Sequence, residues 1–284
     1  MLSRQLLLSL QQSLGPQQAI QELKWMNQAI NQKNTTKLNL NQMVTRRING
    51  EPLQYILGTQ PFGPLNLLTR PPVLIPRPET EHWVIKLSEF LSPTAQNPIS
   101  LLDLGTGSGC IPLLLCHLWP VASLNAHAVD ISPHAIRLAR DNALSTAIAS
   151  SSDPRNIFTT SLANFLSKDF PDPASRAKSP FDVITSNPPY IPTHEYNQLP
   201  RSVKHFEDPR ALCGGQDGYQ FYHAIARLVS QSNILKPTGG LVVLEVGHDQ
   251  AVTVEQIMRD TRRFRRTDIW KDLWGKQRTV LAHT

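Results

Sequence analysis

The most regular pattern of apolar and polar positions begins after Pro98, where short apolar runs alternate with polar turns and with stretches of helical spacing. We predict strands at residues 100–104, 124–131, 156–160, 181–186, 241–246, 265–270 and 278–282. Helices are predicted at 110–118, 133–144, near Asn164 (a short one), at 218–235 and at 250–261. This alternation is typical of an α/β fold, and continuous apolar strands such as Leu241-Val242-Val243-Leu244 favour a parallel sheet covered on both faces.

A helical pattern without strands occupies residues 1–58, which are rich in Gln and Asn. Apolar side chains recur there at helical spacing, at Ala19, Leu23, Met26 and Ile30. Asn41 is a candidate N-cap for a further helix that ends at Gly50. We therefore predict a helical domain at 1–58, an extended or hairpin connector at 59–78, and an α/β domain at 79–284 that opens with a helix over 80–91. Two polar insertions, 149–154 and 169–180, predict surface loops.

Composition narrows the class of protein. Of the 284 residues, 18% are charged and 40% belong to the hydrophobic set, as in ordinary globular chains. No stretch approaches the ~18 uninterrupted apolar residues of a membrane helix, so no membrane association is expected. The three cysteines and nine histidines lack metal-ligand spacing, so no metal site is expected. The net charge of +6 allows a nucleic-acid or ribosome-associated partner without requiring one.

The first 21 residues bear on the compartment, because Arg4 is their only charged residue. With Ser, Leu and Gln around it, this stretch is similar to an organelle presequence and predicts a mitochondrial location. Leu6, Leu10 and Leu14 also fit an ordinary helical stripe, so the cytoplasm is the alternative.

A strand that ends in a glycine turn predicts a ligand site. Leu101-Leu102-Asp103-Leu104 leads into Gly105-Thr106-Gly107-Ser108-Gly109 and a helix, which places a ligand at the carboxyl edge of the sheet. The dinucleotide fingerprint Gly-x-Gly-x-x-Gly is not met, because position 110 is Cys. Asp103 suits an amine or a sulfonium, and Asp130 can accept from both ribose hydroxyls. Together they favour S-adenosylmethionine over NAD, although Asp130 alone could be a helix N-cap.

A second candidate site follows the strand at 181–186, in the sequence Asn187-Pro188-Pro189-Tyr190. Proline cannot donate to a sheet and disfavours a following helix, so the carbonyl groups there can face a ligand. The Asn187 side chain and the Pro188 backbone offer two acceptors, and Tyr190 offers a flat ring. Such a site suits a planar amide or amine. The alternative is a turn that only ends the strand.

These residues and others resemble the HemK/PrmC-type release factor glutamine methyltransferases over nearly the whole chain. The resemblance is carried by residues 51–58, 74–81, 103–109, 129–133, 186–192, 206–212, 214–218, 244–247 and 278–280. Asn-Pro-Pro-Tyr is shared with other methyltransferases, whereas Ile75-Pro76-Arg77-Pro78-Glu79-Thr80-Glu81 is more selective. The resemblance implies an α/β, seven-stranded, Rossmann-like class I methyltransferase sheet with a small N-terminal helical domain.

The resemblance also implies an activity and a partner. A methyl group would pass from S-adenosylmethionine to the side-chain amide nitrogen of the glutamine in the Gly-Gly-Gln motif of a class I peptide-chain release factor. No nucleic acid is directly required, and a monomer is expected. The alternative is an amino-methyltransferase acting on adenine or guanine in nucleic acid, for which no target-recognition module is visible. A cofactor-binding adaptor without catalysis is disfavoured, because both motifs are intact.

Roles carry over from the family to matching positions only. The resemblance assigns cofactor binding to Asp103, Gly105, Thr106, Gly107, Ser108, Gly109, Asp130, Ala163 and Asn187. It assigns catalysis to Asn187, Pro188 and Tyr190, and substrate binding to these three and Pro189. After the third strand the family usually has an acidic or aromatic residue, but this chain has Ser161-Leu162-Ala163-Asn164. Leu162 or Ala163 could only pack against adenine, and Asn164 could bond it only if the alignment shifts. Arg77 and Glu79 are expected to form a structural clasp.

Overall fold

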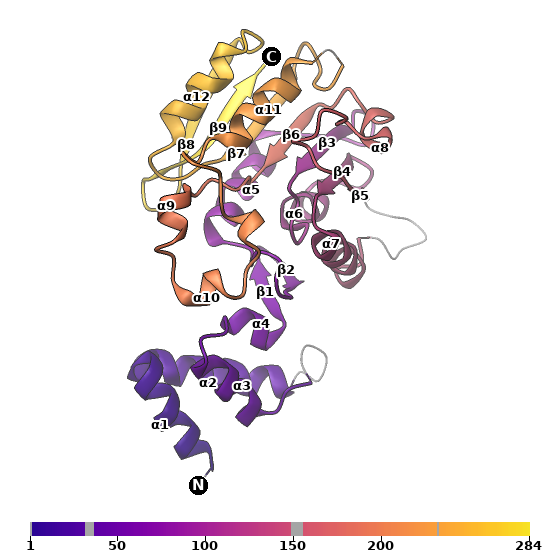
Figure 1. Cartoon of the computed structure of the whole chain (residues 1–284). Helices are drawn as coiled ribbons and strands as arrows, with labels where there is room; N and C mark the ends of the chain where they lie inside the picture. The colour runs from indigo at the N-terminus through magenta and orange to yellow at the C-terminus, as the bar shows by residue number, and fades with distance from the viewer. Residues whose placement is uncertain (1, 32–36, 149–155, 232) are drawn as a thin grey trace.

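The computed structural model describes residues 2–31, 37–148, 156–231 and 233–284, and it has two parts of different architecture (Figure 1). The N-terminal part contains helices α1 (Leu2–Leu14), α2 (Pro16–Asn31), α3 (Leu40–Ile48) and α4 (Leu53–Leu57). The remainder is a seven-stranded sheet with helices on both faces. The α/β fold class predicted from the sequence is confirmed.

A hydrophobic cluster of its own holds the N-terminal helices together. Its buried side chains all come from residues 6–56, and Leu10, Met26 and Met43 are fully buried. Glu22 is buried beside them, but Arg47 pairs its charge with an Nε–Oε2 distance of 2.6 Å. Among the described residues, no buried side chain of the sheet joins this cluster. The helical unit therefore has a core that is separate from that of the sheet.

The N-cap of helix α3 lies two residues before the one that the sequence predicted. Asn39, not Asn41, is the N-cap, and its side chain accepts from the Gln42 amide at 3.0 Å. The Gln42 side chain accepts in return from the Asn39 amide at 3.0 Å. This reciprocal pair satisfies two amides that the first helical turn leaves open, which a cap at Asn41 could not do.

The connector forms a hairpin, one of the two forms that its sequence allowed. Helix α4 ends at Gly58, whose φ of 82° lies in the left-handed region, and strands β1 (Thr59–Phe62) and β2 (Leu65–Leu68) follow as an antiparallel pair. The Asn142 side chain, on α7, bonds both the amide (2.6 Å) and the carbonyl (3.2 Å) of Leu68. These bonds anchor the hairpin to α7 in the sheet part of the chain. Figure 1 shows β1 and β2 between the N-terminal helices and that part.

The main sheet has the strand order β5-β4-β3-β6-β7-β9-β8. Its strands are β3 (Ile99–Leu104), β4 (Leu124–Asp130), β5 (Ile157–Leu162), β6 (Val183–Ser186), β7 (Leu241–Glu245), β8 (Arg266–Lys271) and β9 (Gln277–His283). The first five in this order are parallel, and β9 lies antiparallel between β7 and β8. The order reverses between β3 and β6, which is where open α/β sheets bind ligands.

Two hydrophobic cores cover the two faces of the sheet. One holds Trp83 and Leu114, from α5 and α6, against β3 and β7. The other holds Tyr222 and Val254, from α11 and α12, against the opposite face. The helices of this part are α5 (Pro78–Phe90), α6 (Cys110–Leu118), α7 (Pro133–Ser145), α8 (Pro173–Arg176), α9 (Thr193–Tyr196), α10 (Arg201–Lys204), the 3-10 helix η1 (Pro209–Ala211), α11 (Gln220–Ser230) and α12 (Ala251–Asp260).

Two local predictions were wrong. The short helix expected near Asn164 is a turn, in which the Asn164 side chain accepts from the Leu166 amide at 3.0 Å. The insertion at 169–180 is not wholly a surface loop, because it contains α8 and buries Phe170 in the core. The insertion predicted at 149–154 lies outside the described residues. No helix in the described ranges combines the length and apolar character needed to cross a membrane.

Candidate active site

A cavity of about 420 Å³ lies at the carboxyl edge of the sheet, where its strand order reverses. Gly105 and Gly107 of the glycine turn line it, with Asp130 at the end of β4 and Asn187 and Pro189 just after β6. The structure therefore brings both predicted motifs to one cavity, although they are far apart in sequence. Parallel strands produce this convergence, because their carboxyl ends share one edge.

The glycine turn is held by strand β4. The amides of Gly105 and Thr106 both donate to the Val129 carbonyl, at 2.9 and 3.0 Å. Gly109 has a φ of 80°, and an added Cβ would lie 3.1 Å from the Cβ of Ala139 on α7. Glycine thus allows α7 to pack closely against the turn. Thr106, Ser108 and Gly109 shape the turn without lining the cavity.

Asp130 is fixed by backbone donors. The amide of Gly107 donates to its Oδ2 at 2.9 Å, and the amide of Ser132 donates to its Oδ1 at 2.8 Å. Burial raises the pKa of this carboxyl group, and the two backbone hydrogen bonds oppose that rise. A carboxylate has about four acceptor positions, so each oxygen can still accept from a ligand at the cavity. The alternative role for Asp130 was that of a helix N-cap. The N-cap of α7 is Ser132, and Asp130 lines the cavity.

Asp103 lies beneath the turn and is fully buried. Its Oδ1 accepts from the Thr185 hydroxyl at 2.7 Å, while its Oδ2 has no partner among the described residues. Burial raises the pKa of Asp103 to about 6. Asp103 does not line the cavity, so its predicted role in cofactor binding stays a prediction.

The motif after β6 is held on three sides. Ser186 donates to the Leu104 carbonyl at 2.7 Å, and Asn187 Nδ2 donates to Thr80 Oγ1 at 3.1 Å. The Tyr190 carbonyl accepts from Gln250 Nε2 at 2.9 Å. Among the described residues, nothing donates to Asn187 Oδ1 or to the Pro188 carbonyl, and Asn187 lines the cavity, so its Oδ1 remains open to a ligand.

Pro188 and Tyr190 are set back from the cavity. Neither lines it, and Tyr190 packs against the core that contains Tyr222. Burial raises the pKa of Tyr190 to about 12, so its phenol stays neutral. The predicted role of Tyr190 as a surface under the substrate amide therefore stays a prediction.

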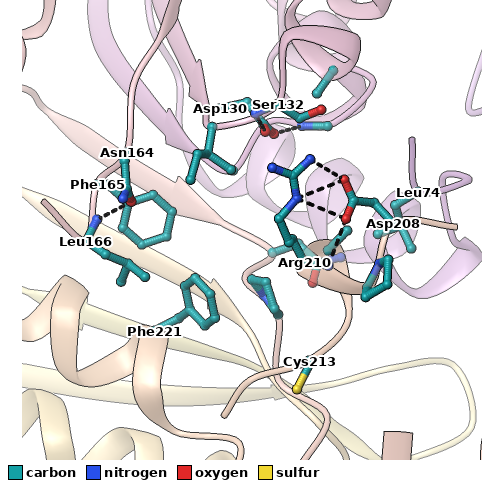
Figure 2. Close-up of a pocket in the computed structure, with 18 of the residues that line it drawn as sticks. Leu74, Asp130, Ser132, Asn164, Phe165, Leu166, Asp208, Arg210, Cys213 and Phe221 are labelled. Atoms are coloured by element: carbon teal, nitrogen blue, oxygen red, sulfur yellow. Dashed lines mark hydrogen bonds and ion pairs between the residues drawn. The ribbon is translucent and has the colours of Figure 1, made fainter. Parts of the chain in front are cut away.

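An apolar wall that the sequence did not reveal completes the cavity (Figure 2). Phe165 and Phe221 meet edge to face with their ring centroids 5.8 Å apart, and Leu166 lies beside them. Ala163, which was expected to bind the cofactor, does not line the cavity; its amide donates to the Asp130 carbonyl at 2.9 Å. The chain turns at Asn164, so Asn164, Phe165 and Leu166 line the cavity and Ala163 does not.

A charged pair at the mouth of the cavity was also missed. Arg210 donates to Asp208 from Nη2 at 2.7 Å, and Figure 2 shows its guanidinium between Asp208 and Asp130. Although burial raises the pKa of Asp208, the hydrogen bonds and charge of Arg210 lower it below its usual value overall. The cavity is thus lined by one cationic group, Arg210, and by two carboxylates, Asp208 and Asp130.

The connector closes the same side of the cavity. Arg77 Nη2 lies 2.6 Å from both carboxylate oxygens of Glu207, and Glu207 Oε2 also accepts from the Ile75 amide at 3.3 Å. The expected clasp therefore exists, but the partner of Arg77 is Glu207 and not Glu79. It joins Val73 and Leu74 to Asp208, all of which line the cavity.

Comparison with known proteins agrees with this geometry. Residues 96–281 match the family model described as "Methyltransferase domain". The chain is 37% identical over 243 residues to the release factor glutamine methyltransferase of Moorella thermoacetica, covering 85% of this chain and 78% of that protein. It is also 37% identical over 239 residues to the release factor glutamine methyltransferase of Koribacter versatilis, covering 84% and 77%.

The chain belongs to the release factor glutamine methyltransferase family. A solved methyltransferase from Pyrococcus furiosus has the same fold, with a TM-score of 0.52 and 16% identity over 77% of this chain and 88% of that chain. The resemblance stated from the sequence motifs is thus confirmed.

The residues of this family member fit S-adenosylmethionine. Asp130 would supply acceptors for the two ribose hydroxyls, and the wall of Phe165 and Phe221 would supply an apolar surface for a flat base. The unpartnered Oδ2 of Asp103 is a buried negative atom beneath the turn, which suits a cationic ligand. Among the described residues, no three His, Cys, Asp or Glu side chains gather as metal ligands do.

Proposed function

We propose that this protein transfers a methyl group from S-adenosylmethionine to the side-chain amide nitrogen of the glutamine in the Gly-Gly-Gln motif of a class I peptide-chain release factor. The observation that carries this proposal is the shared cavity. It contains both Asn187, whose Oδ1 is an open acceptor, and Asp130, the residue suited to the cofactor ribose. Family membership supports the same substrate class.

The chemistry requires alignment more than acid or base strength. An amide nitrogen is a poor nucleophile, because its lone pair is delocalised into the carbonyl group. The cofactor supplies a methyl group that is already activated by its positive sulfur. The protein then has to hold the amide nitrogen in line with that methyl group, within about 3–3.5 Å, which can lower the barrier by several kcal/mol.

Asn187 and Pro188 are proposed to bind the two N–H groups of the glutamine amide. As the new C–N bond forms, positive charge develops on the nitrogen, and its hydrogens become stronger donors. Acceptors at Asn187 Oδ1 and the Pro188 carbonyl then bind the transition state more tightly than the ground state. Neither atom has a donor within the described residues, and Asn187 lines the cavity, which supports its role; Pro188 does not line the cavity, so its role stays a prediction.

A direct test is mass spectrometry of a release factor after incubation with the purified protein and S-adenosylmethionine. We expect a gain of one methyl group on the glutamine of the Gly-Gly-Gln peptide. Duplex and single-stranded DNA and RNA serve as competing substrates in parallel reactions. Methylated adenine or guanine with an unmodified release factor would instead support the base methyltransferase alternative.

The oligomeric state and the compartment stay predictions. A monomer is proposed and can be checked by light scattering coupled to size-exclusion chromatography.

For the proposed mitochondrial location, Leu6 and Leu10 on α1 matter because they are buried in the helical unit. We expect the imported protein to keep these residues, which N-terminal sequencing of protein from fractionated cells can establish. The two relatives compared above are bacterial.

A further inference from the structure

A line of buried hydrogen bonds connects three separate elements behind Asn187. Thr80, in the first turn of α5, donates from Oγ1 to Glu245 Oε2 at the end of β7, at 2.6 Å. Asn187 Nδ2, just after β6, donates to the same Thr80 oxygen at 3.1 Å. Thr80 and Glu245 are 1% and 2% exposed, so water does not compete for these bonds.

Counting hydrogens fixes the direction of each bond. Glu245 Oε2 also accepts from Trp83 Nε1 at 2.8 Å, so this oxygen receives two donors. It therefore acts as an acceptor when Glu245 is ionised and also when the proton of a neutral Glu245 sits on Oε1. The single hydroxyl hydrogen of Thr80 must go to Glu245, which leaves only lone pairs facing Asn187. The group of Asn187 that meets Thr80 must then be its NH₂ group.

This ordering decides what Asn187 presents to the cavity. An amide has its acceptor and its donor on opposite branches, so fixing Nδ2 on Thr80 leaves Oδ1 as the free polar atom. If the amide were turned over, its oxygen would face the lone pairs of Thr80, and its NH₂ group would face the N–H groups of the substrate. Both contacts would be repulsive, and the buried Thr80 oxygen would lose its donor.

We propose that Thr80 and Glu245 are positioning residues that lock the orientation of the Asn187 amide, so that an acceptor always faces the substrate nitrogen. This inference rests on the proposed function, because it concerns the same methyl transfer. It also gives a role to Thr80 in the stretch Ile75–Glu81 and to Glu245 in Leu244–Gly247, two motifs that otherwise have no part in the chemistry.

The elements that carry the relay are rigid. Pro78 opens α5 at its first position, where a proline is already shaped for the helix. The Glu245 backbone carbonyl accepts from the Tyr222 hydroxyl at 2.9 Å, and Glu245 pairs with Thr279 of β9. Neither Thr80 nor Glu245 lines the cavity, so a change at Thr80 reaches the substrate only through Asn187.

The test compares Thr80→Val with Thr80→Ser, using single-turnover methylation of a release factor. Valine has the shape of threonine without its hydroxyl, so the Asn187 amide loses its fixed partner. We expect kcat to fall about tenfold with the KM for the release factor unchanged, since Asn187 loses the hydrogen bond that orients its amide, whereas Glu245 Oε2 keeps Trp83 as a donor. Serine restores the hydroxyl and should keep kcat within about twofold of the wild type.

Thr69→Val is the matched control for loss of a buried hydroxyl. Thr69 is 3% exposed and donates to the Gln54 carbonyl at 2.7 Å, away from the cavity. Its valine variant should keep the wild-type kcat. Equal losses of kcat in Thr80→Val and Thr69→Val would show a general effect of instability and would overturn the proposal.

A double-mutant cycle separates positioning from a merely structural role. If Thr80 acts through Asn187, then Thr80→Val should lower the rate of an Asn187→Ala enzyme by less than about twofold. A full tenfold loss in that background contradicts the relay. Should the wild-type enzyme methylate the factor while Thr80→Val matches it, the relay is wrong and the proposed function stands. No methylation by the wild type would instead remove the proposed function itself.

Discussion

At the scale of single residues, the two aspartates of the cofactor site have different surroundings and should respond differently to mutation. Asp130 lines the cavity and is oriented by two backbone amides, whereas Asp103 lies under the glycine turn with one oxygen unpartnered. The first can bind a ligand directly. The second influences it through charge.

Asp130→Ala should weaken S-adenosylmethionine binding by about 1.5–3 kcal/mol, because charged hydrogen bonds to the ribose are lost. Asp130→Asn should not restore it, because both oxygens accept from backbone amides and an NH₂ group would oppose one of them. Isothermal calorimetry measures the affinity of both variants for S-adenosylmethionine. Asp141→Ala is the control. Asp141 lies on α7, the helix that follows Asp130, and pairs with Arg70 on the surface. Unchanged affinity in Asp130→Ala would falsify the ribose assignment.

Asp103 should make stability depend on pH. Burial raises its pKa from 3.8 to about 6, so the folded protein holds this proton more tightly than the unfolded chain does. The free energy of unfolding must then decrease as the pH rises from about 4 to about 6. Asp103→Asn does not titrate, and its oxygen can still accept from Thr185.

Across this pH range, the stability of Asp103→Asn should therefore improve relative to the wild type by about 3 kcal/mol, at about 1.4 kcal/mol per unit of pKa shift. Urea denaturation of the two ligand-free proteins at several pH values measures this difference. Curves that stay parallel from pH ~4 to ~6 would mean that Asp103 does not hold its proton in the folded state.

At the scale of elements, the pair Arg77–Glu207 joins the connector to the segment that leads into η1. Both segments line the cavity, through Leu74 and Asp208. Glu207→Gln keeps an acceptor for the Ile75 amide but removes the charge that faces Arg77. We expect cofactor affinity to fall about threefold to tenfold, because two walls of the cavity separate more easily, with a loss of stability of about 1 kcal/mol since Arg77 is partly exposed.

Glu51→Gln is the matched variant for this test. Glu51 pairs with Arg46 at 2.6 Å and is nearly as buried as Glu207, but it lies in the helical unit away from the cavity. It should lose similar stability in thermal melts and keep the affinity for S-adenosylmethionine. The same loss of affinity in both variants would show that the clasp has no special effect on the cavity.

Strands β3, β4 and β7 were predictable because each is a short, largely apolar run that ends at a turn, and each differs from its predicted range by one residue at one end. The helix near Asn164 was not predictable in this way. Asn164 starts a turn by capping Leu166 with its own side chain, and this competes with the helix.

The chemical site was only partly readable from the sequence. Glycine and aspartate at a strand end point to a ligand, so Gly105, Gly107 and Asp130 were found. Phe165 and Phe221 were missed because an apolar residue that lines a cavity has the same pattern as one that fills a core. The link from Thr80 to Asn187 spans 107 positions, and only the packed sheet brings these residues together.

At the scale of the whole molecule, the separate core of the helical unit suggests a separate task. A single glutamine side chain offers little surface for selection, so we expect residues 1–58 to contribute to docking of the release factor. Figure 1 shows this unit beyond the β1–β2 hairpin, at a distance from the sheet. Its cluster includes no buried side chain from beyond Ile56 among the described residues.

Deletion of residues 1–58 should therefore spare S-adenosylmethionine binding and abolish methylation of the intact factor. Calorimetry measures the first and mass spectrometry the second, after circular dichroism has shown that the truncated protein is folded. A short Gly-Gly-Gln peptide at high concentration should be methylated equally slowly by both forms. A folded truncated protein that modifies the intact factor at the full rate would contradict this division of tasks.

Strand β9 pairs on both of its sides, with β7 and with β8, although it follows both in the sequence. During synthesis on the ribosome, β7 must wait for residues 277–283 before its second edge is covered. Contacts between such distant segments form slowly, and an open strand edge meanwhile invites aggregation. Because Glu245 ends β7 and pairs with Thr279, this end of β7 stays unpaired on one side until β9 has emerged from the ribosome. The residue proposed to orient Asn187 thus gains this strand partner only after residues 277–283 have joined the sheet.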